Sequence, residues 1–375
     1  MRVLFSFGGG LGHANPMVPI ARACLDAGHS VAFAGRSSAT DVLSGRGFEV
    51  FTDPDDGRRP VSEIAPLAEI DMEHEYEVLQ TYFAGRLARS RVPIVSDECE
   101  VWRPDVVVND EVDYGGMISA EIRGVPHATV LSLASSFLRN AGVAGAVDAL
   151  RSEFGLGPDG ELRMPGRELV LSPFPRSLRE VDLPAAGAAL FRHTVADAER
   201  ARGGATPSVY FTLGTEFNVE SGDLFDRVLA GLGAAGVEAM VTVGREVDPS
   251  RFGAQLASIR IRRFVPQEET LRECDVVINH GGSGSTLGAL SFGRPMIVIP
   301  LGADQLLNAS RCEDLGVAIA LDALRLTPDD VRRAVDRLLM EPGYLAAAGR
   351  VREEIAALPP AASTVAKLAG LGGRS

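Results

Sequence analysis

The stretch Asp275-Val-Val-Ile-Asn-His-Gly-Gly-Ser-Gly-Ser-Thr-Leu287 decides the fold of this 375-residue chain. Its apolar run ends at Asn279 and has the length and composition of a buried strand, and a helix is predicted to begin after the glycines. Glycine lets the backbone come close to a ligand, and the free N–H groups at a helix start attract negative charge. The side chains of His280 and Ser285 add further donors. The stretch therefore predicts a strand–turn–helix unit that binds an anion, and its donors suit a diphosphate.

Other glycine-rich motifs do not fit this loop. A Walker loop needs a lysine after its last glycine, and the only lysine of the chain is Lys367. A nucleophile elbow fails because Ser285 stands where its last glycine is required. The dinucleotide fingerprint fits neither this loop nor the one after the first strand, where His13 replaces the third glycine. A glycine-rich turn with a polar cap is the alternative to a diphosphate site that stays open.

The same alternation of strands and helices extends in both directions from this loop. Strands are predicted at 2–7, 30–35, 105–109, 127–131, 208–213, 238–243, 275–278, 296–299 and 317–320, with helices between them. This alternation indicates parallel sheets. Residues 53–100 are more charged and less regular, and they predict a loop and a long helix outside the sheet.

The length and the repeated pattern predict two domains. We expect an α/β protein with two Rossmann-like, doubly wound domains that face each other across a cleft. The predicted ranges are an N-terminal domain at 1–190, a linker at 191–207, a C-terminal domain at 208–357, and a helix at 358–375 that packs back on the N-terminal domain.

The charge balance limits the partners of the chain. It has 37 Lys and Arg against 50 Asp and Glu, a formal net charge of −13, which argues against nucleic acid and against anionic membrane surfaces. No apolar run reaches the roughly 18 to 20 residues of a membrane helix, and the N-terminus lacks a signal-peptide layout. The four cysteines are scattered, as in a reduced protein. We expect a cytoplasmic protein without stable membrane insertion, and the oligomeric state stays open.

No sequence pattern predicts a metal site. Asp53 and Asp55 form a literal D-x-D, which metal-dependent sugar transferases of another fold use, but they lie in a Pro- and Gly-rich segment that predicts a solvated turn. His74-Glu75 lacks the second histidine of H-E-x-x-H, because position 78 is Val78. We therefore expect no essential metal.

Five motifs together resemble those of the family 1 glycosyltransferases of the GT-B fold, most closely the actinobacterial type that decorates antibiotics. They are Gly12-His-Ala-Asn-Pro16, Gly214-Thr215, Phe264-Val-Pro-Gln267, the loop His280–Ser285, and Pro300-Leu-Gly-Ala-Asp-Gln-Leu-Leu-Asn308. The resemblance follows the family order over nearly the whole chain. It implies inverting, metal-independent transfer of a sugar or deoxysugar from a nucleoside-diphosphate donor to a small hydrophobic aglycone or glycoside. The donor is a co-substrate, and no further cofactor is implied.

The resemblance also implies a donor site, mainly in the C-terminal domain, and an acceptor site, mainly in the N-terminal domain. Phe264 stands against the nucleobase, where the family often has Trp, and Val265 offers backbone hydrogen bonds to the base. Asp304 and Gln305 bind sugar hydroxyls. The full predicted donor set is Gly12, Thr215, Phe264, Val265, Gln267, His280, Gly281, Gly282, Ser283, Gly284, Ser285, Asp304 and Gln305.

One position departs from the plant members of the family. They carry a glutamate that binds the ribose hydroxyls where this chain has Gly288. A donor without a ribose 2′-hydroxyl loses little by this change. The departure favours a dTDP-deoxysugar over UDP-glucose.

Inverting transfer needs a base that removes the acceptor proton, and an imidazole suits this near neutral pH. His13 is the predicted base, because it follows the first strand at the expected cleft edge. A carboxylate that fixes its tautomer makes such a base more effective. Asp110, at the end of the strand 105–109, aligns best with the partner in the family, and a slip of one residue would give the role to Glu111.

Two other functions stay open at this point. A sugar-nucleotide epimerase of similar fold would convert the donor alone, without an acceptor. A non-catalytic auxiliary protein should have lost the base or the phosphate loop, whereas this chain keeps His13, His280, Asp304 and Gln305.

Overall fold

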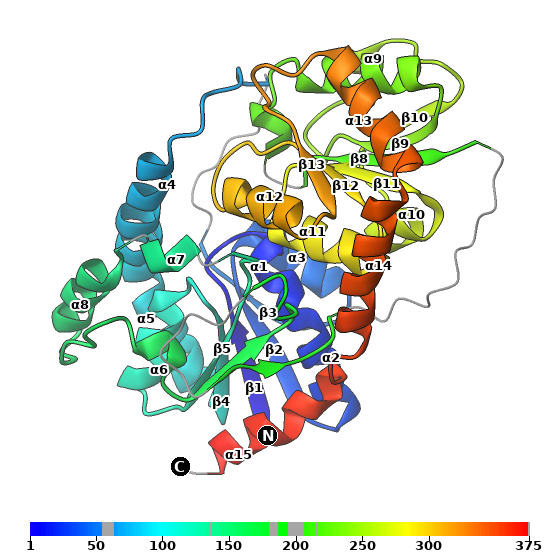
Figure 1. Cartoon of the computed structure of the whole chain (residues 1–375). Helices are drawn as coiled ribbons and strands as arrows, with labels where there is room; N and C mark the ends of the chain where they lie inside the picture. The colour runs from blue at the N-terminus through cyan, green and yellow to red at the C-terminus, as the bar shows by residue number, and fades with distance from the viewer. Residues whose placement is uncertain are drawn as a thin grey trace. The chain divides into compact units, whose positions relative to one another are not determined.

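The computed structural model describes residues 1–54, 64–135, 137–140, 142–179, 187–193, 206–214 and 217–373 (Figure 1). The chain divides into two compact units. The N-terminal unit holds the described residues of Met1–Arg58, Met72–His193 and Leu358–Ser375, and the C-terminal unit holds those of Arg59–Asp71 and Thr194–Ala357.

The N-terminal unit is built on a seven-stranded parallel sheet of order β3-β2-β1-β4-β5-β6-β7. Its strands are β1 Arg2–Ser6, β2 Ser30–Gly35, β3 Glu49–Thr52, β4 Val106–Asp110, β5 His127–Val130, β6 Leu169–Ser172 and β7 Ala189–Leu190. The strand order reverses between β1 and β4, and ligands of such sheets bind at the carboxyl ends of the strands on either side of this point.

Helices cover both faces of this sheet because side chains alternate along each strand. Val3 and Phe5 of β1 pack with residues of α2 and α15 on one face, while Leu4 packs with Val95 of α5 on the other. The helices are α1 Leu11–Ala14, η1 Asn15–Met17, α2 Val18–Asp26, α3 Ser37–Gly45, α4 Met72–Val78, the π-helix η2 Leu79–Leu87, α5 Ala88–Trp102, α6 Tyr114–Ile122, α7 Phe137–Asn140, α8 Ala144–Glu153, η3 Met164–Gly166, η6 Ala361–Thr364 and α15 Val365–Gly372.

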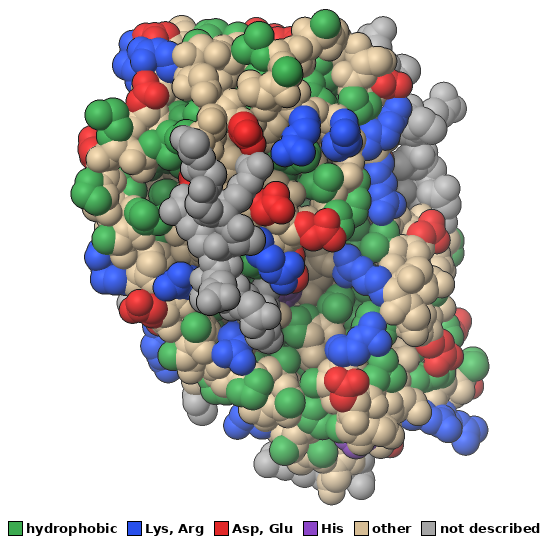
Figure 2. Space-filling view, turned by 90° about the vertical axis from the view of Figure 1, so that its right-hand side faces the viewer, with side chains coloured by type: hydrophobic (Ala, Val, Ile, Leu, Met, Phe, Trp, Pro, Cys, Tyr) green, Lys and Arg blue, Asp and Glu red, His purple; other side chains and the backbone are tan. Residues whose placement is uncertain are grey.

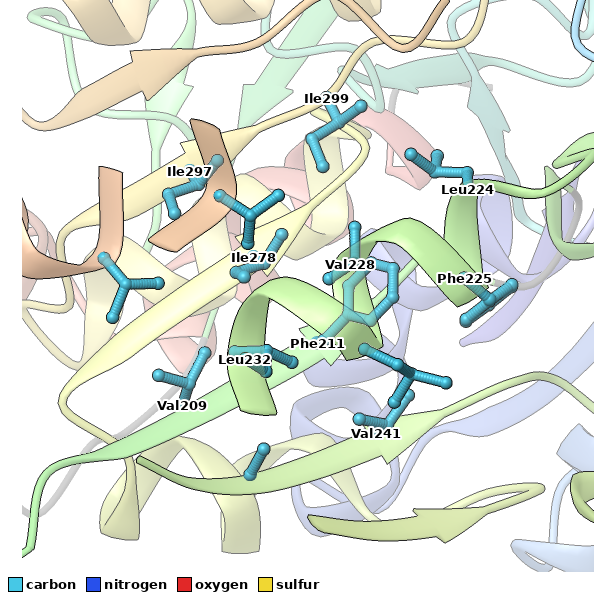
Figure 3. Packing of buried hydrophobic residues seen from close by; sticks show 14 of the residues in the cluster. Val209, Phe211, Leu224, Phe225, Val228, Leu232, Val241, Ile278, Ile297 and Ile299 are labelled. Atoms are coloured by element: carbon cyan, nitrogen blue, oxygen red, sulfur yellow. The ribbon is translucent and has the colours of Figure 1, made fainter. Parts of the chain in front are cut away.

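The C-terminal unit holds a six-stranded parallel sheet of order β10-β9-β8-β11-β12-β13. Its strands are β8 Ser208–Thr212, β9 Glu238–Thr242, β10 Ile259–Arg262, β11 Val276–Asn279, β12 Met296–Val298 and β13 Ala318–Ala320. Its helices are η4 Phe217–Glu220, α9 Leu224–Ala235, η5 Pro249–Phe252, α10 Gln267–Glu273, α11 Ser283–Ser291, α12 Gln305–Asp314, α13 Pro328–Met340 and α14 Pro342–Ala356. In the core, Val228 and Leu232 of α9 pack against Phe211 and Ile278 of the sheet (Figure 3).

The predicted fold class, with two parallel α/β sheets, is confirmed, and the predicted strands agree with the observed ones to within a residue or two. β3, β6, β7 and β10 were not predicted. β7 has only two residues, and β10 reads Ile-Arg-Ile-Arg at a sheet edge, so neither presents the apolar run of a buried strand.

One segment lies in a different unit from the one its position in the sequence indicates. Residues 64–71 fall within the predicted range 1–190, yet they belong to the C-terminal unit. The Ala65 N–H donates to the Val219 carbonyl at 2.6 Å, and the Gly222 N–H donates to the Ala65 carbonyl at 3.0 Å. Ile64 and Leu67 pack against the core of that unit.

The distribution of surface charge and the length of the helices are relevant to the partners that the chain can bind. Basic and acidic side chains are interspersed across the face shown in Figure 2. Within the described ranges, no helix combines the length and the apolar character that crossing a bilayer requires.

Candidate functional site

The predicted pair His13–Asp110 lies where the order of the N-terminal sheet reverses. β1 and β4 are adjacent, with Ser6 opposite Asn109. The turn after β1 leads into α1, which carries His13, and β4 ends at Asp110. The Nδ1 atom of His13 lies 3.1 Å from each carboxylate oxygen of Asp110. Gly9 makes room for this imidazole, because a Cβ there would lie 2.0 Å from the ring atom Cδ2.

Hydrogen bonds hold the buried Asp110 side chain as a carboxylate. Burial raises its pKa, but the charge and hydrogen bond of His13, together with hydrogen bonds from Ser132 and Val112, outweigh burial, so the pKa of Asp110 is lowered. This carboxylate favours the tautomer with the proton on Nδ1, which leaves Nε2 as the basic nitrogen. The His13 side chain is 21% exposed and Asp110 is 0% exposed. The imidazole is therefore accessible to a substrate, and the buried carboxylate contacts the imidazole on its Nδ1 side.

The three acids at the end of β4 have three different partners. Asp110 contacts His13. Glu111 forms a buried, two-pronged ion pair with Arg179, with both N–O distances at 2.9 Å. Asp113 caps α6 by accepting a hydrogen bond from a backbone N–H of its first turn at 3.1 Å. The structure thus places Asp110, and not Glu111, beside the imidazole.

Asp53 is buried, so the prediction of a solvated turn was wrong for this residue. It accepts a hydrogen bond from Arg91, which is 1% exposed and also contacts Asp113 and the Ser6 hydroxyl. An arginine that reaches in from α5 makes burial of the carboxylate possible. Asp55 lies outside the described residues. Over the part of the chain that the structure describes, there is no cluster of three or more His, Cys, Asp or Glu side chains that could hold a metal ion.

An aromatic side chain lies beside the imidazole. The Phe83 ring centroid is 6.0 Å from that of His13, and the Phe83 side chain is half-buried. Phe83 belongs to the π-helix η2, a type of helix found frequently at functional sites. Gly12 lies in α1 next to His13, in the N-terminal unit, whereas the other described residues of the predicted donor set lie in the C-terminal unit. Thr215 lies outside the described residues.

The predicted diphosphate loop lies at the corresponding position of the C-terminal sheet, after β11 and next to β8. Gly281 has a φ of +85°, and Gly282 precedes the first turn of α11 in an extended conformation. The N-cap residue of α11 is Gly282, which has no side chain, and the amides of residues 283–285 lie in the first turn of this helix. His280 is 7% exposed, and burial lowers its pKa to about 4. This loop presents a neutral imidazole and the N-terminus of a helix.

Two glycines leave the space that the His280 ring occupies. A Cβ on Gly282 would lie 2.3 Å from the His280 Nε2 atom, and one on Gly214 would lie 2.6 Å from its Cε1 atom. Phe217 lies nearby, with its ring centroid 5.8 Å from that of His280. The glycines of this loop therefore serve the packing of the imidazole as well as the approach of a ligand.

Asp304 and Gln305, predicted to bind sugar hydroxyls, are buried and hydrogen bonded within the unit. The Ser283 hydroxyl donates to Asp304 Oδ2 at 2.7 Å, and Asn308 Nδ2 donates to the same oxygen at 2.8 Å. Gln305 Oε1 accepts from the Leu301 N–H at 2.7 Å. In this structure Asp304 links the loop after β12 to the diphosphate loop, whereas the Gln305 side chain bonds within the loop after β12.

The predicted nucleobase residues follow β10. Phe264 is 60% exposed, and the Arg245 guanidinium lies 5.8 Å from its ring centroid. Val265 comes next, and Gln267 begins α10. A Cβ on Gly288 would lie 3.5 Å from the Gln267 side chain, an ordinary contact distance. The structure brings Gln267 and Gly288 together and leaves the Phe264 ring open to a base.

Sequence reasoning missed the residues that support these groups. Asn308 donates to the Gly281 carbonyl at 2.8 Å and to Asp304, and its i, i+4 spacing from Asp304 was the available signal. Ser132 and Arg179 support Asp110 and Glu111, and no local pattern marks either of them.

We expect Gly282→Ala to destabilise the loop through His280. The added methyl group overlaps the imidazole, which is packed so closely that a Cβ on Gly214 would also lie within 2.6 Å of it. The free energy of unfolding should fall by about 1–3 kcal/mol, and nucleotide affinity should fall with it. Thermal unfolding and titration calorimetry with dTDP measure both effects.

A double variant separates this clash from other effects of the substitution. Gly282→Ala combined with His280→Ala should regain most of the lost stability, because the overlapping ring is gone. Gly284→Ala is the stability control, since a Cβ there meets nothing within 4 Å. A Gly282→Ala protein as stable as the wild type would contradict the packing role of Gly282.

Comparisons with known proteins identify the family of this chain. Residues 226–371 match the family model "Erythromycin biosynthesis protein CIII-like, C-terminal domain". The L-demethylnoviosyl transferase of Streptomyces niveus is 30% identical over 370 residues, which cover 91% of this chain and 93% of that protein.

Solved structures show the same fold over the whole chain. The glycosyltransferase SnogD from Streptomyces nogalater is 26% identical, with a TM-score of 0.77 and coverage of 100% of this chain and 99% of that one. The spinosyn rhamnosyltransferase SpnG, solved in complex with thymidine diphosphate, is 23% identical, with a TM-score of 0.82 and coverage of 98% and 100%. The chain belongs to the family 1 glycosyltransferases of the GT-B fold, in their natural-product group, and it is a glycosyltransferase.

Proposed function

We propose that this enzyme moves a deoxysugar from a nucleoside-diphosphate donor to a small natural-product acceptor, with inversion at the anomeric carbon. The observation that carries the proposal is the partly exposed His13 imidazole on the buried Asp110 carboxylate. The His13 Nε2 atom takes the acceptor proton while the acceptor attacks the anomeric carbon and the bond to the diphosphate breaks. Asp110 stabilises the imidazolium that forms.

The diphosphate loop supplies the second half of the proposed chemistry. The leaving nucleoside diphosphate gains negative charge as the glycosidic bond to it breaks. The amides of residues 283–285, at the positive end of α11, and the His280 imidazole stabilise that charge. Because this assembly stabilises the leaving group, we propose that transfer needs no divalent metal ion. Phe264 holds the base, and Asp304 and Gln305 contact the sugar.

The surroundings of His13 favour a hydrophobic acceptor. Phe83 lies next to the imidazole, with its ring centroid 6.0 Å from that of His13. Elsewhere in the same unit, Tyr76 of α4 and Phe137 form another aromatic pair, with ring centroids 5.2 Å apart. Aromatic side chains offer large apolar contact areas for an aglycone. The relative from Streptomyces niveus is named an L-demethylnoviosyl transferase, which is consistent with this class of reaction.

Turnover with a panel of nucleotide sugars and aglycones, with and without EDTA, tests the proposed function. We expect a glycoside product from a dTDP-deoxysugar and a hydrophobic acceptor, at an unchanged rate in EDTA. Conversion of the donor to an epimer without acceptor, or binding of donor with no turnover against any acceptor, would contradict the proposal.

We expect dTDP to bind more tightly than UDP, because Gly288 offers no carboxylate to the ribose hydroxyls. Gly288→Glu should narrow this difference by about threefold to tenfold, since the new carboxylate accepts a hydrogen bond from the 2′-hydroxyl that only UDP carries. The position tolerates a Cβ, with nearest contacts at 3.4 and 3.5 Å. Titration calorimetry with both nucleotides gives the ratio.

Gly288→Ala is the matched control for this prediction. It adds the Cβ of the glutamate without its carboxylate and should keep the wild-type ratio of affinities. A wild-type protein that prefers UDP would overturn the donor assignment.

A further inference from the structure

Ser132 lies in the loop after β5 and contacts the proposed catalytic pair from the side. Its hydroxyl donates to Asp110 Oδ1 at 2.7 Å and lies 3.5 Å from His13 Nδ1. The Val112 N–H reaches the same oxygen at 3.3 Å, and the Gly8 N–H reaches Oδ2 at 3.4 Å. The hydrogen bond from the Ser132 hydroxyl is therefore the shortest of these hydrogen bonds to the Asp110 carboxylate. Ser132 belongs to a different chain segment from those that carry His13 and Asp110.

A buried ion pair fixes the backbone of Ser132. Glu111 Oε1 accepts from the Ser132 N–H at 2.6 Å and from the Leu133 N–H at 2.7 Å. Arg179 binds both oxygens of Glu111 and also donates to the Leu133 carbonyl at 2.5 Å. The Arg179 and Glu111 side chains are 1% and 0% exposed. A buried ion pair contributes little net stability compared with apolar residues, so its use here calls for another reason.

We propose that Ser132 is a positioning residue for glycosyl transfer, and that the Glu111–Arg179 pair holds it in place. The Ser132 hydroxyl fixes the plane of the Asp110 carboxylate, so that this group meets His13 Nδ1 and aims the imidazole. This inference rests on the proposed role of His13 as the base. It assigns a function to Glu111 and Arg179, which the proposed reaction does not otherwise use.

The Ser132 hydrogen bond also sets how strongly Asp110 attracts a proton on His13. The hydroxyl withdraws negative charge from the carboxylate. Without it, the carboxylate stabilises the imidazolium more strongly, and His13 becomes protonated at a higher pH. The other titratable side chains around the pair, among the described residues, are Glu111, Asp113, Tyr114, Arg91 and Arg179. The two arginines pair with the two acids, and burial raises the pKa of Tyr114. Burial also raises the pKa of Glu98, an acid of α5 that interacts with Arg91 and Asp113, to about 8, so the titration of His13 has to be followed on its own ring signal.

An NMR titration of the histidine rings of the full chain tests the inference without any substrate. The chain has six histidines, and His13→Ala identifies the His13 signal. Ser132→Ala should move the His13 titration midpoint up by roughly half a pH unit. With the best donor and acceptor, kcat/KM at its plateau should fall about 3- to 10-fold, and its acid limb should move to higher pH with the midpoint.

Matched variants isolate the hydroxyl from the packing of the loop. Ser135→Ala removes another buried hydroxyl of this loop, which has no hydrogen-bond partner among the described residues, and should change neither the midpoint nor the rate. Ser132→Thr and Ser132→Val have the same shape, and only threonine keeps the donor. Ser132→Thr should behave as the wild type, and Ser132→Val should behave as expected for Ser132→Ala. If Ser132→Ala fails to fold, the comparison of Ser132→Thr with Ser132→Val tests the role of the hydroxyl.

The outcomes separate this inference from the proposed function. If Ser132→Ala matches Ser135→Ala in midpoint and kcat/KM while His13→Ala loses transfer, Ser132 has no positioning role and the function stands. If His13→Ala keeps normal turnover, the proposed mechanism fails whatever Ser132 does. A midpoint that moves down in Ser132→Ala would also overturn the inference.

Discussion

His13→Ala is expected to lower kcat by about 10²- to 10⁴-fold, the range that a positioned general base contributes. The substitution removes the only imidazole placed on the Asp110 carboxylate among the described residues, and with it the acceptor of the proton. Donor affinity should change by no more than about twofold, because the proposed phosphate and base contacts lie in the C-terminal unit. Initial-rate kinetics and calorimetry with dTDP measure the two effects separately.

His13→Gln is the control for structural damage. The glutamine amide can still donate to the Asp110 carboxylate, so the buried charge keeps a partner, but an amide is no base near neutral pH. This variant should fold as the wild type and lose transfer as the alanine variant does. Turnover within tenfold of the wild type in either variant would refute the base assignment.

The sequence predicts the location of this pair because the fold does most of the positioning. β1 and β4 are buried parallel strands, which appear as continuous apolar runs, and residues that follow adjacent strands share one edge of the sheet. His13 and Asp110 could therefore be brought together from the sequence alone. The choice between Asp110 and Glu111 could not, since neighbouring residues of a strand point to opposite faces. The distances of 3.1 Å from His13 Nδ1 to both carboxylate oxygens of Asp110 settle which side chain contacts the imidazole.

The supporting residues could not be predicted, because their partners are far away in the sequence. Ser132 is 22 residues from Asp110, and Arg179 is 68 residues from Glu111. Such hydrogen bonds depend on loop conformations, which have no periodic signal. The internal hydrogen bonds of Asp304 are another case, since a motif shared with a family indicates a residue's position and not its partners in the unliganded protein.

Arg91→Met is expected to lower the free energy of unfolding by about 3–5 kcal/mol, the cost of breaking a buried ion pair from one side. Arg91 is fully buried, and its guanidinium contacts Asp53, both oxygens of Asp113 and the Ser6 hydroxyl. Methionine fills the space of the arginine stem and supplies no donor, so two buried carboxylates lose their cation. Equilibrium denaturation in guanidinium chloride measures the loss.

The same helix supplies the control for Arg91. Arg89 pairs with Glu153 in solvent, with the two side chains 53% and 45% exposed. Arg89→Met should therefore change the stability by less than about 1 kcal/mol. Equal losses in the free energy of unfolding for Arg89→Met and Arg91→Met would show that the buried ion pairs of Arg91 contribute no more stability than the exposed pair of Arg89.

The dependence on pH identifies the charge as the cause of the loss. Burial raises the pKa of Asp53, and Arg91 opposes this effect. Without Arg91 the pKa of Asp53 rises further, and a carboxyl group with a raised pKa in the folded state loses stability as the pH rises through that value. The deficit of Arg91→Met should therefore shrink as the pH is lowered from 7 towards 4.

A second substitution tests whether Asp113 carries much of the effect. Asp113→Asn removes one unpaired charge and keeps a good N-cap for α6. The double variant Arg91→Met/Asp113→Asn should be more stable than the sum of the two single losses predicts. Asp113 follows Asp110 by three residues, and its N–H donates to the Asp110 carbonyl at 3.0 Å. Strict additivity would mean that Asp113 has no share in the charge effect of Arg91, and that the turn carrying Asp110 does not depend on the ion pair between Arg91 and Asp113.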